Sequence, residues 1–165
     1  MRAPRLPRLV SILLALGFAA TGASAQIDVT ATSGNPGPLT YPTLQLAFAA
    51  VNNGVHKGDV VMAVTADTSE TASAVLNASG SGAADYTSVA VVPSGDAPRT
   101  ISGAIAGAPL LDLNGADQVT IDGLDVNGNS LTISNTAVDA TAGTSTIRFQ
   151  GDATSIYNTL SLIHI

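Results

Sequence analysis

The chain has 165 residues, enough for one domain with its own hydrophobic core, and its net charge is −6. This acidic balance argues against nucleic acid and against an anionic membrane surface as partners. Because the chain contains no cysteine, an exported form would be held together by its core and its backbone hydrogen bonds rather than by disulfides.

Residues 1–25 have the pattern of a secretory signal peptide. Three arginines precede the apolar run Leu9–Ala20, which is too short to span a bilayer, and a small-residue cleavage site follows at Ala23–Ala25. We therefore expect cleavage before Gln26, export of the mature chain, and no transmembrane span in it. Removal of this segment leaves three basic residues against twelve acidic ones, a net charge of −9.

One helix is predicted in the mature chain, at about residues 43–53. Thr43 is suited to cap its N-terminus, and Asn52–Gly54 is suited to end it. Four apolar residues recur at helical spacing and share one face: Leu44, Ala47, Phe48 and Val51. We expect this apolar helix to cover the N-terminal end of a β structure, because open strand edges and an exposed core need a cap.

The remainder reads as short strands separated by turns rich in Gly, Asn and Asp, most densely in Leu110–Ile133. Thr100–Gly103 resembles Thr120–Gly123, and Leu111–Gly115 resembles Leu124–Gly128. A period near twenty residues predicts an all-β solenoid, a parallel β-helix over residues 26–159 with the short helix as its cap. Seven residues are expected to point inward: Leu111, Leu113, Val119, Ile121, Leu124, Leu131 and Ile133. A β-sandwich is the alternative, because periodicity in short strands is ambiguous.

The last six residues, 160–165, read LSLIHI. This string resembles the translation of an adapter used in sequencing libraries, so we interpret it as a non-native tail. The natural protein is then expected to continue beyond about Thr159, with further C-terminal domains missing, and the predicted β-helix to be truncated at its C-terminus.

Three segments carry a family resemblance: YPTLQLAFAAVNNGVHKGDVVMAV, SETASAVLNASGSGAADYTSVAVVPSG and GADQVTIDGLDVNGNSLTISNT. They resemble the N-terminal region of large bacterial secreted or surface proteins with a pectate-lyase-like, right-handed parallel β-helix. The resemblance covers about Ile27–Thr159. It implies that fold and secretion or display at the surface of a bacterium. It leaves the function open, because that superfamily includes lyases, hydrolases, adhesins and passive stalks.

Enzymes of that superfamily use clustered Asp residues to hold calcium, with an Arg or Lys as base. The matching residue types are Asp112, Asp122, Asp125 and Arg148. Each Asp lies close to Gly or Asn, where an Asp that bonds its own turn is the simpler interpretation, so these are weak candidates for a metal site. Calcium is the only cofactor considered, and no catalytic or cofactor-binding residue is predicted.

Two other residue types have structural interpretations. His56 lacks a catalytic or metal-ligand context, so an exposed loop histidine is expected. Four asparagines are expected to stack their amides at successive turns: Asn114, Asn127, Asn129 and Asn135.

These features favour a non-catalytic structural or binding module of an exported surface protein: a stalk, an adhesin or a scaffold that contacts carbohydrate. Polysaccharides or cell-surface components are the expected partners. The alternative is a fragment of a polysaccharide lyase or glycoside hydrolase whose active-site segments are missing, so whether the full protein is an enzyme stays open.

Overall fold

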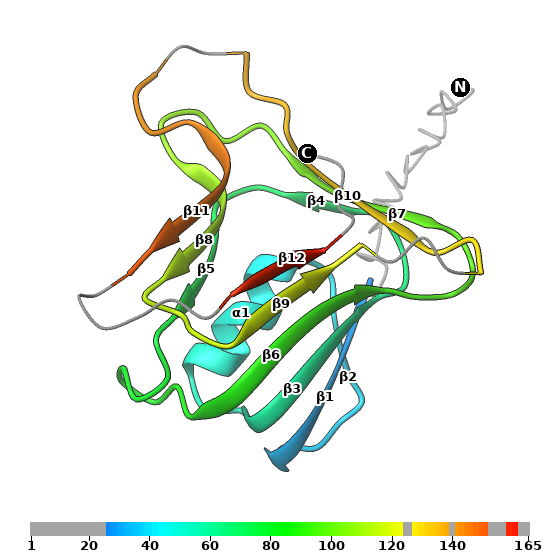
Figure 1. Cartoon of the computed structure of the whole chain (residues 1–165), viewed down its shortest axis with the longest axis vertical. Coiled ribbons are helices and arrows are strands. Elements are labelled where there is room, and N and C mark those ends of the chain that lie inside the picture. The colour runs from blue at the N-terminus through cyan, green and yellow to red at the C-terminus, as the bar shows by residue number, and fades with distance from the viewer. Residues whose placement is uncertain (1–25, 124–126, 139–140, 152–157, 162–165) are drawn as a thin grey trace, which may run out of the picture.

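The structure is a computed structural model that describes residues 26–123, 127–138, 141–151 and 158–161 (Figure 1). Twelve strands and one helix lie in these ranges, so the chain is mostly β. The predicted signal peptide and residues 162–165 of the predicted adapter tail lie outside them, and both stay predictions. Among the described residues, no helix is long and apolar enough to cross a membrane.

The first sheet has six strands and mixes parallel with antiparallel pairing. In spatial order they are β12 (Thr159–Ser161), β9 (Val119–Asp122), β6 (Tyr86–Pro93), β3 (His56–Val64), β1 (Ile27–Gly34) and β2 (Leu39–Tyr41). β1 runs antiparallel to β2 and to β3, whereas the other neighbours in this sheet are parallel. A connection as short as residues 35–38 between β1 and β2 permits only antiparallel pairing.

Two smaller sheets are entirely parallel and have three strands each. The second sheet contains β10 (Ser130–Asn135), β7 (Pro98–Gly103) and β4 (Thr68–Glu70). The third contains β11 (Ser145–Gln150), β8 (Pro109–Asn114) and β5 (Ala74–Asn77). Figure 1 shows the three sheets arranged around a common interior.

The predicted right-handed parallel β-helix is therefore wrong. The described strands form three small sheets, one mixed and two parallel, and not a closed or solenoid β-helix. β1 pairs antiparallel with both of its neighbours; the tight turn at residues 35–38 folds the chain back into β2, and β3 lies antiparallel on the other side of β1. An antiparallel sandwich does not describe the molecule either, because two of its sheets are entirely parallel.

The predicted period of twenty residues is also wrong as a description of strand pairing. Ile101 lies opposite Ile133, and Val91 lies opposite Ile121, so paired strands are about thirty residues apart. The similar segments Thr100–Gly103 and Thr120–Gly123 lie in different sheets, the second and the first. The similarity therefore reflects repeated strand-and-turn chemistry rather than the spacing of paired strands.

The inward side chains of all three sheets form one hydrophobic core. Six of the seven residues predicted to point inward are buried: Leu111, Leu113, Val119, Ile121, Leu131 and Ile133. The seventh, Leu124, lies outside the described residues. Alternation of apolar and polar residues matches the buried face of β9 and β10, whereas in β8 Leu110 and Asp112 are buried as well as the predicted leucines.

The helix α1 (Leu44–Asn52) forms where the apolar spacing predicted it. The Thr43 hydroxyl accepts a hydrogen bond from the Leu46 amide at 3.3 Å, and Gly54 follows the helix with a φ of 69°. All four residues of the predicted apolar face are buried. α1 packs mainly against β5 and also contacts β1, β2, β3 and β4, so it covers the interior at the side of the molecule where these strands lie (Figure 1).

Candidate functional site

Asp112 is a partner in an ion pair. It lies on β8 directly opposite Arg148 of β11, and it is only 5% exposed. Arg148 Nε donates to one carboxylate oxygen at 2.9 Å, and Arg148 Nη2 donates to the other at 2.5 Å. The hydrogen bond to Asp112 raises the pKa of Arg148. Because both carboxylate oxygens are engaged, Asp112 has a structural role here.

The candidate metal ligands are not gathered into one site. Asp122 lies at the end of β9 in the first sheet, whereas Asp112 lies in the third sheet. Asp125 lies outside the described residues. Within the described ranges, no group of three or more His, Cys, Asp or Glu side chains is placed to hold a metal ion. Calcium binding stays a prediction.

His56 is not an exposed loop residue, contrary to expectation. It opens β3 and is fully buried. Its Nδ1 lies 2.7 Å from the Asn35 carbonyl oxygen, and its Nε2 lies 2.9 Å from the Tyr41 hydroxyl, whose ring meets the imidazole edge-on. Since a carbonyl only accepts, Nδ1 carries the proton and the Tyr41 hydroxyl donates to Nε2. Both ring nitrogens of His56 are therefore engaged. They link β3 to Tyr41 of β2 and to Asn35 in the turn between β1 and β2.

Glu70 has a role that the sequence did not indicate. It is 3% exposed at the end of β4, and its carboxylate accepts hydrogen bonds from two amides at the start of α1. Oε1 lies 2.9 Å from the Leu44 nitrogen, and Oε2 lies 3.0 Å from the Gln45 nitrogen. A carboxylate at a helix N-terminus satisfies unpaired amides and complements the helix dipole. No local signal could reveal this contact, because it joins residues about 25 positions apart.

Stacked amides occur, but with a partner that was not predicted. Asn114 Nδ2 donates to Asn77 Oδ1 at 3.0 Å, and these residues face each other on β8 and β5. Asn77 is fixed in turn, because its amide donates to Asn52 Oδ1 and its carbonyl accepts from the Tyr86 hydroxyl. The partner of Asn114 is therefore itself fixed by hydrogen bonds to α1 and to Tyr86.

Of the other three predicted amides, Asn135 does not continue this contact. Asn135 instead bonds backbone groups of neighbouring loops: its Oδ1 accepts from Ile105 and Ala137, and its Nδ2 donates to Ile105 and Ser145. Asn127 adopts a positive φ of 56° in a turn, and Asn129 follows that turn. Asparagine at a turn can thus bond another side-chain amide, bond backbone groups or adopt a positive φ, and its position in the sequence does not distinguish these roles.

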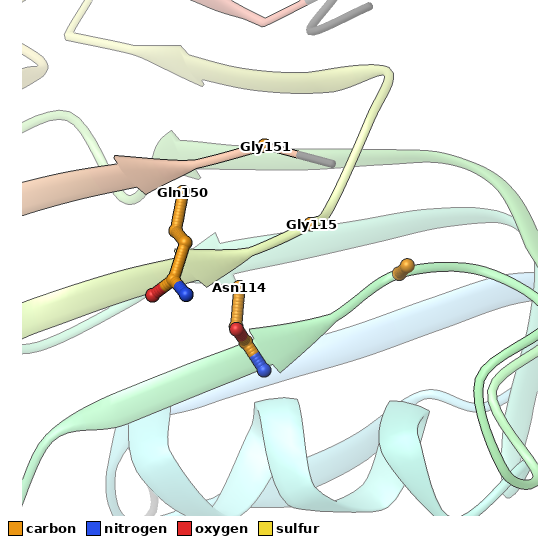
Figure 2. A pocket seen from close by; sticks show the side chains of 5 residues that line it. Asn114, Gly115, Gln150 and Gly151 are labelled. Atoms are coloured by element: carbon orange, nitrogen blue, oxygen red, sulfur yellow. The ribbon is translucent and has the colours of Figure 1, made fainter. Parts of the chain in front are cut away.

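A shallow pocket of about 270 Å³ lies beside Asn114, at the turns that follow β5, β8 and β11. We call it the amide pocket; it is lined by Ala78, Asn114, Gly115, Gln150 and Gly151. Figure 2 shows the Asn114 and Gln150 side chains extending in the same direction from neighbouring strands. The small residues leave room, and the two amides supply both donors and acceptors.

None of the described residues that line the amide pocket has an ionisable side chain. Its hydrogen-bonding groups are neutral, and Gln150 makes no side-chain hydrogen bond to the described residues. Such a lining suits a neutral, hydroxyl-rich ligand, because each amide can donate to one hydroxyl and accept from another.

Comparison of the chain with protein-family models, with curated proteins and with solved structures gave no match.

Proposed function

We propose that the chain is a non-catalytic structural and binding module of an exported surface protein, and that it contacts neutral carbohydrate at the amide pocket. The observation that carries this proposal is the pair of amide side chains, Asn114 and Gln150, which extend in the same direction in a pocket otherwise lined by Ala and Gly. Export is supported by the signal-peptide pattern of residues 1–25.

The arrangement of the ionisable groups supports a structural role. The carboxylates of Asp112 and Glu70 are buried and bonded to Arg148 and to α1, respectively, and His56 is buried between a hydroxyl and a carbonyl. Groups held in this way fix the architecture and are withdrawn from solvent. An active site for glycosidic-bond cleavage would require two acids facing one cleft.

The test is carbohydrate binding by the purified protein. Saturation-transfer NMR is run with a panel of neutral and acidic oligosaccharides, followed by titration of any that bind. Gln150→Ala is expected to weaken binding of a neutral oligosaccharide by about tenfold, since one good hydrogen-bonding group contributes about 1.4 kcal/mol. Gln45→Ala, an amide on α1 outside the pocket, is the matched control and should leave binding unchanged.

A second assay addresses the alternative, a lyase or hydrolase. The protein is incubated with acidic and neutral polysaccharides, with and without calcium, and the products are examined for unsaturated ends and for new reducing ends. We expect neither product. Turnover of any polysaccharide would refute the non-catalytic assignment. Carbohydrate binding that is unchanged in both Gln150→Ala and Asn114→Ala would show that the ligand binds outside the amide pocket.

A further inference from the structure

Asparagine followed by glycine occurs three times in the chain, at Asn53–Gly54, Asn114–Gly115 and Asn127–Gly128. Such a pair can modify itself, because the glycine nitrogen can attack the asparagine side chain and glycine has no Cβ to obstruct the ring that forms. The reaction needs a glycine amide that is free of hydrogen bonds and a backbone that can move. The structure places the three pairs in different surroundings in both respects.

The first pair is engaged at the end of α1. The Gly54 amide donates to the Val51 carbonyl at 2.9 Å, and the Asn53 amide donates to the Ala49 carbonyl at 3.0 Å. Gly54 is also closely packed, since a Cβ there would lie 2.6 Å from the Ala83 carbonyl oxygen. Before this amide could react, its hydrogen bond would have to open and the end of the helix would have to shift.

The second pair is held more firmly still. The Gly115 amide donates to the Leu113 carbonyl at 3.1 Å and to the Gln150 carbonyl at 2.5 Å. Asn114 Nδ2 donates to Asn77 Oδ1 at 3.0 Å. Both the attacking nitrogen and the side-chain nitrogen that would leave are therefore bonded, and freeing them would disturb the contacts of β8 with β5 and β11.

The third pair lies in the turn between β9 and β10. Asn127 and Gly128 are both exposed, and their φ angles are 56° and 81°. Positive φ at two successive residues is the pattern of a type I′ turn, which is closed by the amide of the residue after the pair and not by the glycine amide. The Gly128 amide donates no hydrogen bond to the described residues, so it is presented to water.

We propose that Asn127 is a site of spontaneous deamidation in the folded protein. The Gly128 nitrogen loses its proton to water and attacks Cγ of Asn127. The bond from Cγ to the side-chain nitrogen breaks, and that nitrogen leaves as ammonia. Water then opens the cyclic imide at either carbonyl, which gives aspartate or isoaspartate in place of the neutral amide. The site is separate from the amide pocket and does not depend on the function proposed for it.

The modification changes a turn that lies against another turn. A Cβ on Gly128 would lie 3.3 Å from the Asp96 carbonyl oxygen. The pairing of β10 with β7 begins shortly afterwards, where Ser130 lies opposite Pro98. Isoaspartate adds a carbon atom to the main chain, so this product introduces both a charge and a longer connection at the entry to β10.

The experiment follows deamidation at each asparagine of the purified protein during incubation at mildly alkaline pH, where the glycine nitrogen loses its proton more readily. Tryptic digestion and mass spectrometry with electron-transfer fragmentation locate the modification and distinguish aspartate from isoaspartate. The first and second pairs must each open at least one hydrogen bond, at about 0.5–1.5 kcal/mol, and also shift their backbone. We therefore expect Asn127 to react about tenfold or more faster than Asn53 and Asn114.

Two controls connect this difference to the fold. In guanidinium chloride the unfolded chain should deamidate all three pairs at similar rates, because each is then exposed. Asn127→Gly keeps a residue that tolerates a positive φ, and it should remove most of the acidic species that ion-exchange chromatography detects after incubation of the unmodified protein.

Similar rates at the three pairs in the folded protein would overturn the proposal. So would an unmodified Asn127 in the folded protein after a time in which the unfolded chain has reacted at all three pairs. Persistence of the same acidic species in Asn127→Gly, with thermal unfolding showing that the variant is folded, would place the modification at another residue.

Discussion

Single buried side chains connect elements that are distant in sequence. Glu70 of β4 holds the first two amides of α1, and Arg148 of β11 neutralises Asp112 of β8. Each carboxylate is desolvated and regains its hydrogen bonds from specific partners, two backbone amides for Glu70 and one guanidinium for Asp112. For the Asp112 pair, loss of the guanidinium alone is therefore more costly than loss of both charges together.

Replacement of Glu70 by Ala is expected to lower the free energy of unfolding by about 2 kcal/mol, because it leaves the Leu44 and Gln45 amides without acceptors. Glu70→Gln keeps one acceptor oxygen and should lose about half as much. Urea denaturation of the two variants measures both values. Equal stability of the Ala variant and the unmodified protein would show that water replaces the carboxylate without loss.

Replacement of Arg148 by Ala is expected to destabilise the protein more than the double replacement Arg148→Ala with Asp112→Asn. The single change leaves the Asp112 carboxylate buried without its guanidinium, and the second change removes that charge. A double-mutant cycle in thermal unfolding tests this. If the double variant is the least stable of the set, Asp112 has another stabilising partner.

Among the secondary-structure elements, side-chain hydrogen bonds attach α1 to β5 and attach the loop before β6 to the start of that strand. Asn52 Nδ2 donates to the Val75 carbonyl at 2.8 Å, which ties the end of α1 to the edge of β5. The Tyr86 hydroxyl donates to the Asn77 carbonyl at 2.6 Å, and the Ser79 hydroxyl bonds both the amide and the carbonyl of Tyr86. These bonds close the loop over residues 78–85.

Asn52→Ala is expected to reduce the free energy of unfolding by about 1–3 kcal/mol, because it removes two hydrogen bonds from a sheet edge. It should also raise the tendency to aggregate, since the β5 edge loses its cover. Chemical denaturation and static light scattering measure the two effects. Gln45→Ala, on the same helix, serves as the control and should change neither.

Stability is expected to fall above pH 10. Burial raises the pKa of Tyr86 to about 12, a hydrogen bond from the Ser79 backbone lowers it, and the charge of Asp117 raises it. The folded state therefore favours the neutral phenol. This contribution is complete below the unfolded pKa of 10 and is lost as pH rises from 10 to 12. The full difference is about 2.7 kcal/mol, which partial solvent access reduces to about 1–2 kcal/mol.

Urea denaturation at a series of pH values from 8 to about 11.5 measures this loss. Tyr86→Phe should be less stable at neutral pH, because the bond to the Asn77 carbonyl is gone, but its stability should fall less steeply above pH 10. Burial also raises the pKa of Tyr41, so some dependence on pH should persist in the variant. If the free energy of unfolding of Tyr86→Phe falls as steeply with pH as that of the unmodified protein, groups other than Tyr86 cause the loss.

For the molecule as a whole, local patterns predicted local structure and failed at longer range. The spacing of Leu44, Ala47 and Phe48 located α1, and alternation located the buried face of β9 and β10. The arrangement of the sheets was missed because pairing partners such as Ile101 and Ile133 have no sequence feature that selects them. The direction of β1 was missed because it depends on one turn.

The candidate sites were predicted even less well than the fold. Asp112 was selected for its residue type, but its role depends on Arg148, 36 positions further along the chain. His56 was expected to lie exposed in a loop because it has no catalytic or metal-ligand context, yet it is buried and bonds the Asn35 carbonyl and the Tyr41 hydroxyl. The amide pocket joins turn residues from three strands, and none of the three turns is distinctive alone.

The wide separation of the paired strands has a kinetic consequence. Nearly every strand contact except the β1–β2 hairpin requires closure of a loop of about thirty residues before any pairing energy is gained. We therefore expect refolding on the millisecond-to-second timescale rather than in microseconds. The chain contains no tryptophan, so stopped-flow far-UV circular dichroism is the suitable measurement. During that interval the unpaired strands are exposed, and yields on refolding should fall as protein concentration rises.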